Sequence, residues 1–390
     1  MIHRTGRDIV HRWQGNPLIS IQSLGFRIAD IRNATVAPLN GETIMLITME
    51  SLQGYSLIYK AVSEDGIHFS VHPEPLMNLP TEGPRALYEG YGQRDPRITR
   101  LDQTYYISYI ADGKRGLRLA LAKTDDFEDI EFVGYVTQPD VKNGLLFPQK
   151  IDGRYALLKR PSGGDIWISY SDDLEFWGDE RVVMTKRGGH WDASRIGGSA
   201  VPILIDKGWL LIYYGIKETS AAPLCRLGAA ILDRDDPSQV VARSNIPILS
   251  PRERYERIGD VPNVVFSCGA VLHEDEDELW IYYGGSDSCI CLGMTPVKDV
   301  VEFCIASTVV EKFLADEADR AARQQAEQQR ERNTREHRER KRKQASTPRA
   351  GTHEPAEEKG KRHERRKRQH QADEPETPKP PKEQKFLPSS

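Results

Sequence analysis

Five stretches of the chain repeat one pattern, and this repeat constrains the fold more than any other feature of the sequence. Each stretch is a short aromatic or β-branched run, a polar or Gly-containing turn, and a second alternating run. They begin near residues 43, 104, 154, 208 and 278, and a spacing of roughly 50–70 residues suits a four-stranded propeller blade with variable loops. The periodicity predicts no long amphipathic helix before residue 305. We therefore predict an all-β body folded as a five-bladed β-propeller, because a two-sheet sandwich would not account for five similar units.

The charge is divided unevenly between this body and the C-terminal region. From Arg320 to Ser390 there are 21 Lys and Arg against 12 Asp and Glu, whereas residues 1–319 carry 33 against 46. The basic region has almost no aliphatic or aromatic residues and cannot bury enough apolar surface to offset its ordering entropy. We predict a propeller domain at residues 1–310 and a charged, largely disordered tail at 311–390. Its first part, rich in Ala, Gln, Glu and Arg, favours an exposed, frayed helix.

The composition also bears on partners and compartment. A basic tail suits a nucleic-acid or anionic surface, but Glu is interspersed, so we favour a solubilising extension and expect no nucleic-acid partner. The chain start lacks a hydrophobic signal core and no apolar run is long enough to span a membrane, which predicts a cytoplasmic protein without a membrane partner. Five cysteines without a CxxC pair predict buried free thiols: Cys225, Cys268, Cys289, Cys291 and Cys304.

The segment YGQRDPRITR places one carboxylate, Asp95, among Arg94, Arg97 and Arg100, with Pro96 directly after it. Asp95 is either a structural salt-bridge acid or a catalytic acid beside groups that bind an anion. In a propeller the inner strands converge on an axial channel, so polar residues at equivalent positions of different blades meet there. The polar interruptions of otherwise apolar strands are Glu50, Asp95, Lys159, Arg160, Tyr214 and Asp287.

Six stretches, in order, resemble glycoside hydrolase family 130, the five-bladed propeller enzymes that include β-mannoside phosphorylases. They are GNPLIS, RDPRITRLDQTYYISYIA, LLFPQKIDGRYALLKRPSGGDIWISYSDDLEFWG, SRIGGSAVPILIDKGWLLIYYGI, CRLGAAILDRDDP and VPNVVFSCGAVL followed by YYGGSDS. The resemblance implies inverting phosphorolysis of β-mannosides, of the mannooligosaccharide or mannosyl-glucose type, releasing α-mannose 1-phosphate. An inverting β-mannoside hydrolase and a sugar-binding propeller without catalysis remain the alternatives.

The resemblance also assigns roles to residues. Asp95 aligns with the acid that protonates the departing glycosidic oxygen, by way of a hydroxyl of the bound mannosyl unit. A phosphate nucleophile needs cations rather than a second carboxylate. The matching positions assign Arg97, Lys159, Arg160, Arg195 and Tyr214 to phosphate binding, and Asn33, Glu50 and Asp287 to sugar binding.

The chain departs from the family pattern at some of these positions. Thr48 replaces an Arg and Tyr214 a His, which weakens the phosphate site, whereas Arg94, Lys159, Arg160 and Arg195 leave enough positive charge to rebuild it. A hydrolase would need a base, for which Glu50 and Glu256 are candidates.

Other parts of the site are predicted more loosely. Trp167, Trp191 and Tyr91 are candidates for stacking on sugars, and His190 and Asp192 for a loop over the channel mouth, with packing and turn formation as the alternatives. No His, Asp and Glu cluster has ligand-like spacing, so we expect no metal centre and no cofactor, with inorganic phosphate as co-substrate. A homo-oligomer remains open.

Overall fold

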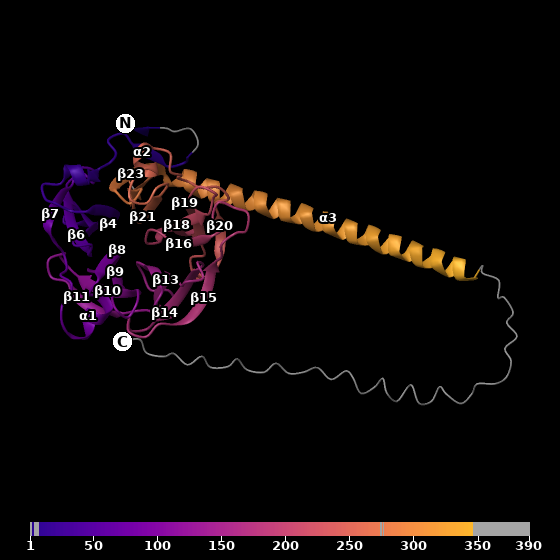
Figure 1. The fold of residues 1–390 in the computed structure, drawn as a ribbon, viewed down its shortest axis with the longest axis horizontal. Coiled ribbons are helices and arrows are strands. Elements are labelled where there is room, and N and C mark those ends of the chain that lie inside the picture. Colours follow the sequence, from indigo (N-terminus) through magenta and orange to yellow (C-terminus); the bar gives the residue numbers. More distant parts are fainter. Residues whose placement is uncertain (1, 4–7, 274, 276, 346–390) are drawn as a thin grey trace, which may run out of the picture. The chain divides into compact units, whose positions relative to one another are not determined.

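The computed structural model describes every residue except 1, 4–7, 274, 276 and 346–390. The chain divides into two compact units, Met1–Asp319 and Arg320–Ser390. The first is mostly β-sheet with few helices, as the sequence predicted (Figure 1). The predicted domain boundary between residues 310 and 311 falls inside the helix α3 (Val297–Ala345). The boundary stays a prediction. The predicted disorder of the tail beyond residue 345 lies outside the described residues.

The described strands form five consecutive antiparallel groups, which we call modules 1 to 5. Modules 1 and 2 belong to one sheet because a single parallel pair, Ser56 with Gly92, joins them. Module 1 comprises β4 (Asp30–Leu39), β5 (Glu42–Glu50), β6 (Ser56–Ser63) and β7 (Ser70–Pro75). Module 2 comprises β8 (Gly92–Leu101), β9 (Thr104–Asp112), β10 (Arg118–Thr124) and β11 (Glu131–Tyr135). Module 3 comprises β12 (Lys142–Leu146), β13 (Tyr155–Arg160), β14 (Ile166–Ser171) and β15 (Gly178–Met184).

The last two modules have additional strands. Module 4 comprises β16 (Arg195–Gly198), β17 (Ile203–Ile205), β18 (Gly208–Lys217), β19 (Leu224–Leu232) and β20 (Val240–Arg243). Module 5 contains β21 (Val265–His273), β22 (Glu278–Gly285) and β23 (Cys289–Pro296), with β1 (Ile2–His3), β2 (His11–Trp13) and β3 (Ile19–Ser20) from the start of the chain. The short helices are η1 (Ile21–Ser23), α1 (Gly83–Glu89) and α2 (Arg254–Arg257).

The Asp-rich turns have the same structure in modules 1 to 4. Asp65, Asp126, Asp173 and Asp233 each follow the next-to-last strand of their module, and the Oδ1 atom of each accepts hydrogen bonds from the backbone N–H groups two and three residues later. A short acceptor side chain of this kind replaces the backbone pairing lost where the strand ends. In these four turns the Asp side chain therefore satisfies backbone donors that the strand no longer pairs.

The apolar core of the described residues consists of five clusters, each lying between two modules. Four of them join consecutive modules, 1 with 2, 2 with 3, 3 with 4, and 4 with 5. The fifth joins the last module to the first, with Trp280 and Tyr282 of β22 against Met45 of β5 and Tyr59 of β6. The five described cysteines are free and buried, as predicted.

The described residues also bear on membranes and metals. No helix among them is long and apolar enough to cross a membrane. No group of three or more His, Cys, Asp or Glu within the same residues could hold a metal ion.

Candidate active site

A polar cavity of about 270 Å³ lies where the first strands of the modules approach one another. It gathers six of the predicted site residues, with at least one from each of the five modules: Asn33, Asp95, Arg160, Arg195, Tyr214 and Asp287. Lys142, Asn143, Cys225 and Phe266 line it as well. The cavity is therefore rich in both carboxylates and cations.

Bulges in the first strands aim several of these side chains. The register of β4 shifts at Asn33, that of β8 at Asp95 and that of β12 at Asn143. These three residues have φ angles of 47°, 54° and 57°, and Asp287 has a φ of 50°. Asn and Asp tolerate this left-handed conformation better than other residues with a side chain, and a bulge re-aims a side chain out of the strand's regular alternation. Such strained positions cluster at functional sites.

The Asp95 carboxyl group is hydrogen-bonded through one oxygen, while its other oxygen has no hydrogen bond to the described residues. Its backbone N–H donates to Thr48 Oγ1 at 2.9 Å, and Asn33 Nδ2 donates to its Oδ1 at 2.7 Å. Among the described residues, no hydrogen bond reaches Oδ2 and no cation forms an ion pair with the carboxyl group. Arg94 pairs with Asp112 at 3.3 Å instead. The contacts therefore favour a group presented to a ligand over a structural salt-bridge acid.

Asp287 is the second carboxyl group of the cavity. Burial, and after it the nearby Asp95 carboxylate, raise the pKa of Asp287 to about 7. A group titrating there accepts hydrogen bonds as a carboxylate and donates one when protonated. It can therefore pair with sugar hydroxyls in either state.

Three cations face the cavity without a carboxylate partner among the described residues: Lys142, Arg160 and Arg195. Arg160 Nε donates to Asn143 Oδ1 at 2.9 Å, which fixes the guanidinium plane and leaves its terminal nitrogens available. Burial lowers the pKa of Lys142, and the charges of Arg94 and Arg160 lower it further. Like charges gathered without compensation favour the binding of an anion.

Tyr214 closes the cavity beside these cations. It is buried on β18, its hydroxyl donates to Asn143 Oδ1 at 3.1 Å, and its ring lies 4.9 Å from that of Phe266. Its cross-strand partner on β16 is Gly197, where a Cβ would lie 2.6 Å from the Tyr214 ring. A glycine is required there for the aromatic ring to fit.

Comparison with known proteins agrees with this arrangement. A family model described as beta-1,4-mannooligosaccharide phosphorylase matches residues 26–306. The chain belongs to glycoside hydrolase family 130. Within this family it is 39% identical over 243 residues to a 1,2-beta-oligomannan phosphorylase of Thermoanaerobacter sp., covering 62% of this chain and 78% of that one. It is 31% identical to a beta-1,4-mannooligosaccharide phosphorylase of Ruminococcus albus, covering 76% and 91%.

A solved structure of the same family resembles the fold closely. The beta-1,2-mannobiose phosphorylase of Listeria innocua, in complex with beta-1,2-mannobiose, superposes with a TM-score of 0.69 at 30% identity. The match covers 76% of this chain and 99% of that chain.

Three residues predicted from the family pattern lie outside the cavity lining. Arg97 is fully buried and donates to the backbone carbonyls of Asp95 and Ser199, both at 2.9 Å. Lys159 forms an ion pair with Glu180, and Glu50 forms one with Arg32. Arg97 therefore supports the chain around Asp95, while the other two are neutralised by neighbours.

Six lining residues were missed from the sequence: Lys142, Asn143, Ile216, Cys225, Val264 and Phe266. Lys142 and Asn143 lie just before LLFP, one of the family-like stretches, with Gly144 between, and Cys225 and Phe266 belong to two others. A polar pair at the start of an apolar run was the available signal for Lys142 and Asn143. Nothing in the local sequence distinguished Cys225 and Phe266 from core residues.

Three further candidates from the sequence, Trp191, Asp192 and Glu256, lie outside the cavity lining. Asp192 is fully buried in a separate charged cluster, and Trp191 packs against the Tyr213 ring. Glu256 is fully buried, and its carboxylate accepts from Arg12 at 2.7 and 2.9 Å and from Tyr283 at 2.9 Å.

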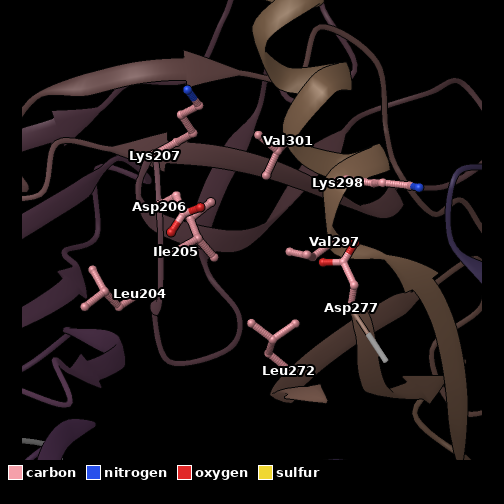
Figure 2. Close-up of a pocket in the computed structure, with 9 residues that line it drawn as sticks. All are labelled: Leu204, Ile205, Asp206, Lys207, Leu272, Asp277, Val297, Lys298 and Val301. Carbon is pink, nitrogen blue, oxygen red and sulfur yellow. The ribbon is translucent and has the colours of Figure 1, made fainter. Parts of the chain in front are cut away.

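A second hollow of about 500 Å³ lies between β17, the β21–β22 turn and the first turns of α3 (Figure 2). It contains none of the predicted site residues and has Leu272, Val297 and Val301 in its wall.

Proposed function

We propose that this chain is an inverting phosphorylase that cleaves β-mannosides with inorganic phosphate and releases α-mannose 1-phosphate. The observation that carries the proposal is the composition of the cavity, where one carboxyl group with a free oxygen, Asp95, faces three cations without carboxylate partners. Asp95 would supply the proton for the departing glycosidic oxygen, by way of a mannosyl hydroxyl, as the family pattern implies. Lys142, Arg160 and Arg195 would hold the phosphate, with Tyr214 donating a neutral hydrogen bond.

Neither candidate for the base of a hydrolase, Glu50 or Glu256, is available to activate water. A hydrolase of the inverting type needs a second carboxylate to activate water. Glu50 is paired with Arg32, and Glu256 is occupied by Arg12 and Tyr283. Asp287 lines the cavity, but a pKa of about 7 leaves much of it protonated at neutral pH. We assign Asp287 and Asn33 to the mannosyl hydroxyls.

The proposal extends to the fold and the linkage. Five modules with a core cluster between each neighbouring pair, the last and first included, support a closed five-bladed propeller with the cavity on its axis. Three relatives that are 37–40% identical are named for β-1,2-linked mannosides, against 31% and 29% for two named for 4-linked mannosides. We therefore propose β-1,2-linked mannosides as the preferred substrates.

The test is incubation with β-1,2- and β-1,4-mannobiose, each with and without phosphate. Phosphate-dependent mannose 1-phosphate, formed faster from the β-1,2 isomer, is the expected result. Free mannose at a rate independent of phosphate would establish hydrolysis instead. No product from either disaccharide, with sugar binding retained, would establish a binding protein.

A further inference from the structure

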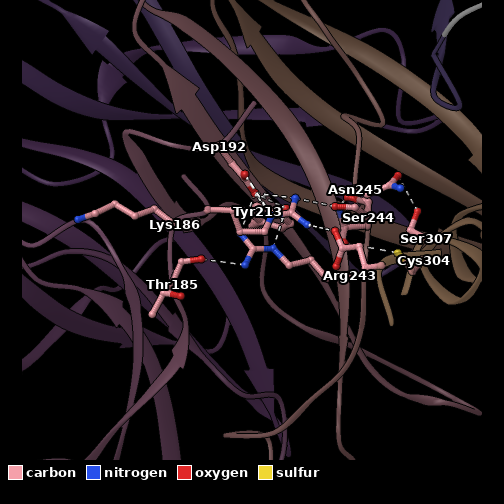
Figure 3. Close-up of polar contacts among 12 residues, drawn as sticks. Thr185, Lys186, Asp192, Tyr213, Arg243, Ser244, Asn245, Cys304 and Ser307 are labelled. Carbon is pink, nitrogen blue, oxygen red and sulfur yellow. Dashed lines mark hydrogen bonds and ion pairs between the residues drawn. The ribbon is translucent and has the colours of Figure 1, made fainter. Parts of the chain in front are cut away.

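A cluster of largely buried charges surrounds the Tyr213 hydroxyl (Figure 3). It lies on the other face of β18 from the cavity, which Tyr214 lines. Asp192, fully buried, is its centre. It accepts hydrogen bonds from Arg187 Nη2 at 2.9 Å, Arg243 Nη2 at 2.7 Å and the Tyr213 hydroxyl at 3.0 Å. Asp192 is the only carboxylate that pairs with Arg243 among the described residues, so removing it would leave that partly buried cation without an ion-pair partner.

Two covalent routes lead from this cluster to the cavity. Tyr213 and Tyr214 are consecutive on β18, so their side chains point to opposite faces, one into the cluster and the other into the cavity. The loop from Arg187 continues through Asp192 to Arg195, the first residue of β16. This loop is packed without slack, because a Cβ at Gly215 would lie 2.5 Å from the Cβ of Asp192.

The first turns of α3 complete the cluster. Arg187 Nη1 donates to Glu311 at 2.7 Å, and the backbone N–H of Arg243 donates to Thr308 Oγ1 at 3.0 Å. Glu311 and Asp192 together balance the two arginines. The sulfur of Cys304, buried on the same helix, lies 3.4 Å from the backbone carbonyl of Ala229 and anchors the helix to β19.

We infer that this cluster positions Arg195 and Tyr214 for phosphate, and that Glu311 makes helix α3 part of that support. The inference rests on the proposed function, since it names what holds the phosphate side of that site. Asp192, Arg187 and Glu311 touch neither phosphate nor sugar, so they are positioning residues. Loosening the cluster shifts Arg195 and Tyr214 while leaving Asp95, on β8, in place.

The test compares Glu311→Gln with Glu317→Gln in the full chain. Both variants remove one negative charge from α3, but Glu317 is exposed and forms no hydrogen bond or ion pair with the described residues. A partly exposed ion pair is worth little, so Glu311→Gln is expected to raise KM for phosphate about two- to fivefold. The values of kcat and of KM for mannobiose should stay within about twofold, Glu311→Asp should restore part of the loss, and Glu317→Gln should match the wild type.

Asp192→Asn, if it folds, should raise KM for phosphate by about tenfold or more for the same reason. An unchanged KM for phosphate in Glu311→Gln, or an equal rise for phosphate and mannobiose, would overturn the inference. Phosphate binding is also followed as a phosphate-dependent rise in Tm, which does not require turnover. If wild type binds phosphate but releases no sugar phosphate, the proposed function fails alone. If Glu311→Gln then keeps the full Tm rise, the inference fails as well.

Discussion

The fit between Gly197 and Tyr214 gives the sharpest quantitative prediction. A methyl group added at position 197 would lie 2.6 Å from Cε1 and 2.8 Å from Cζ of Tyr214. Carbon atoms pack at about 3.5–4.0 Å, so the ring must move by roughly 1 Å. The Gly197 backbone is ordinary strand, and the effect of Gly197→Ala therefore comes from this contact alone.

The stability cost of Gly197→Ala follows from the contacts that hold the Tyr214 ring in place. Tyr214 is buried, packs on Phe266 and donates its hydroxyl hydrogen bond to Asn143 at 3.1 Å. Overpacking a buried site costs about 1–3 kcal/mol, and losing a hydrogen bond of this kind costs about 1 kcal/mol more. We expect Gly197→Ala to lower the free energy of unfolding by about 2–4 kcal/mol.

Urea denaturation of four proteins tests the reasoning: wild type, Gly197→Ala, Tyr214→Ala and the double variant. With the ring removed, Gly197→Ala should cost less than about 1 kcal/mol, which gives a large coupling energy. Gly134→Ala on β11, where nothing lies within 4 Å of the new methyl, is the matched control and should change stability by at most about 0.5 kcal/mol. An equal cost of Gly197→Ala in both backgrounds would refute the steric explanation.

Three further predictions concern the acid, the second carboxyl group and the tail. Asp95→Asn should keep the fold and sugar binding but lower kcat by about 10²–10⁴-fold, with a smaller loss for an activated aryl mannoside; equal losses for good and poor leaving groups would contradict an acid role. The pKa of Asp287 near 7 lies above its ordinary value near 4, so the folded protein binds the extra proton and loses stability as pH rises from 4 to 7. Asp287→Asn should remove that loss of stability, which is measured by comparing denaturation curves at pH 5 and pH 8. If the variant keeps the pH dependence of the wild type, another group causes it. Truncation after Asp319 should leave cooperative unfolding and activity intact, since Glu311 is kept; loss of soluble protein would show that the tail is structural.

The repeat was readable because one strand of each module is a run that is apolar on both faces. The segments predicted to begin near residues 43, 104, 154, 208 and 278 are β5, β9, β13, β18 and β22. The strand before each of them was not recognised as part of the repeat. Polar residues at the bulges, such as Asn33 and Asp95, break the alternation there, and β16 is only four residues long.

The residue types of the site could be predicted from the sequence, but the direction in which each side chain points could not. Lys159 and Arg160 are adjacent on a strand and point to opposite faces, and only the packed sheet decides that Arg160 lines the cavity. Arg97 resembles an anion-binding residue in the sequence, yet its donors are used by backbone carbonyls, including that of Ser199 about a hundred positions away. Such long-range contacts leave no local pattern in the sequence.

The pairing of β2 with β23 has a consequence for how the protein is made. His11 and Arg12 pair with Met294 and Gly293, so the sheet of module 5 is finished by a strand that is synthesised before modules 1 to 4. Modules 1 to 4 can pair their own strands as they emerge, whereas β2 has to wait for nearly the whole body to be synthesised. Completion of module 5 is then a late step of folding. A nascent chain stalled before β23 would leave both β2 and the outer edge of β22 unpaired, although these strands lie near opposite ends of the propeller sequence.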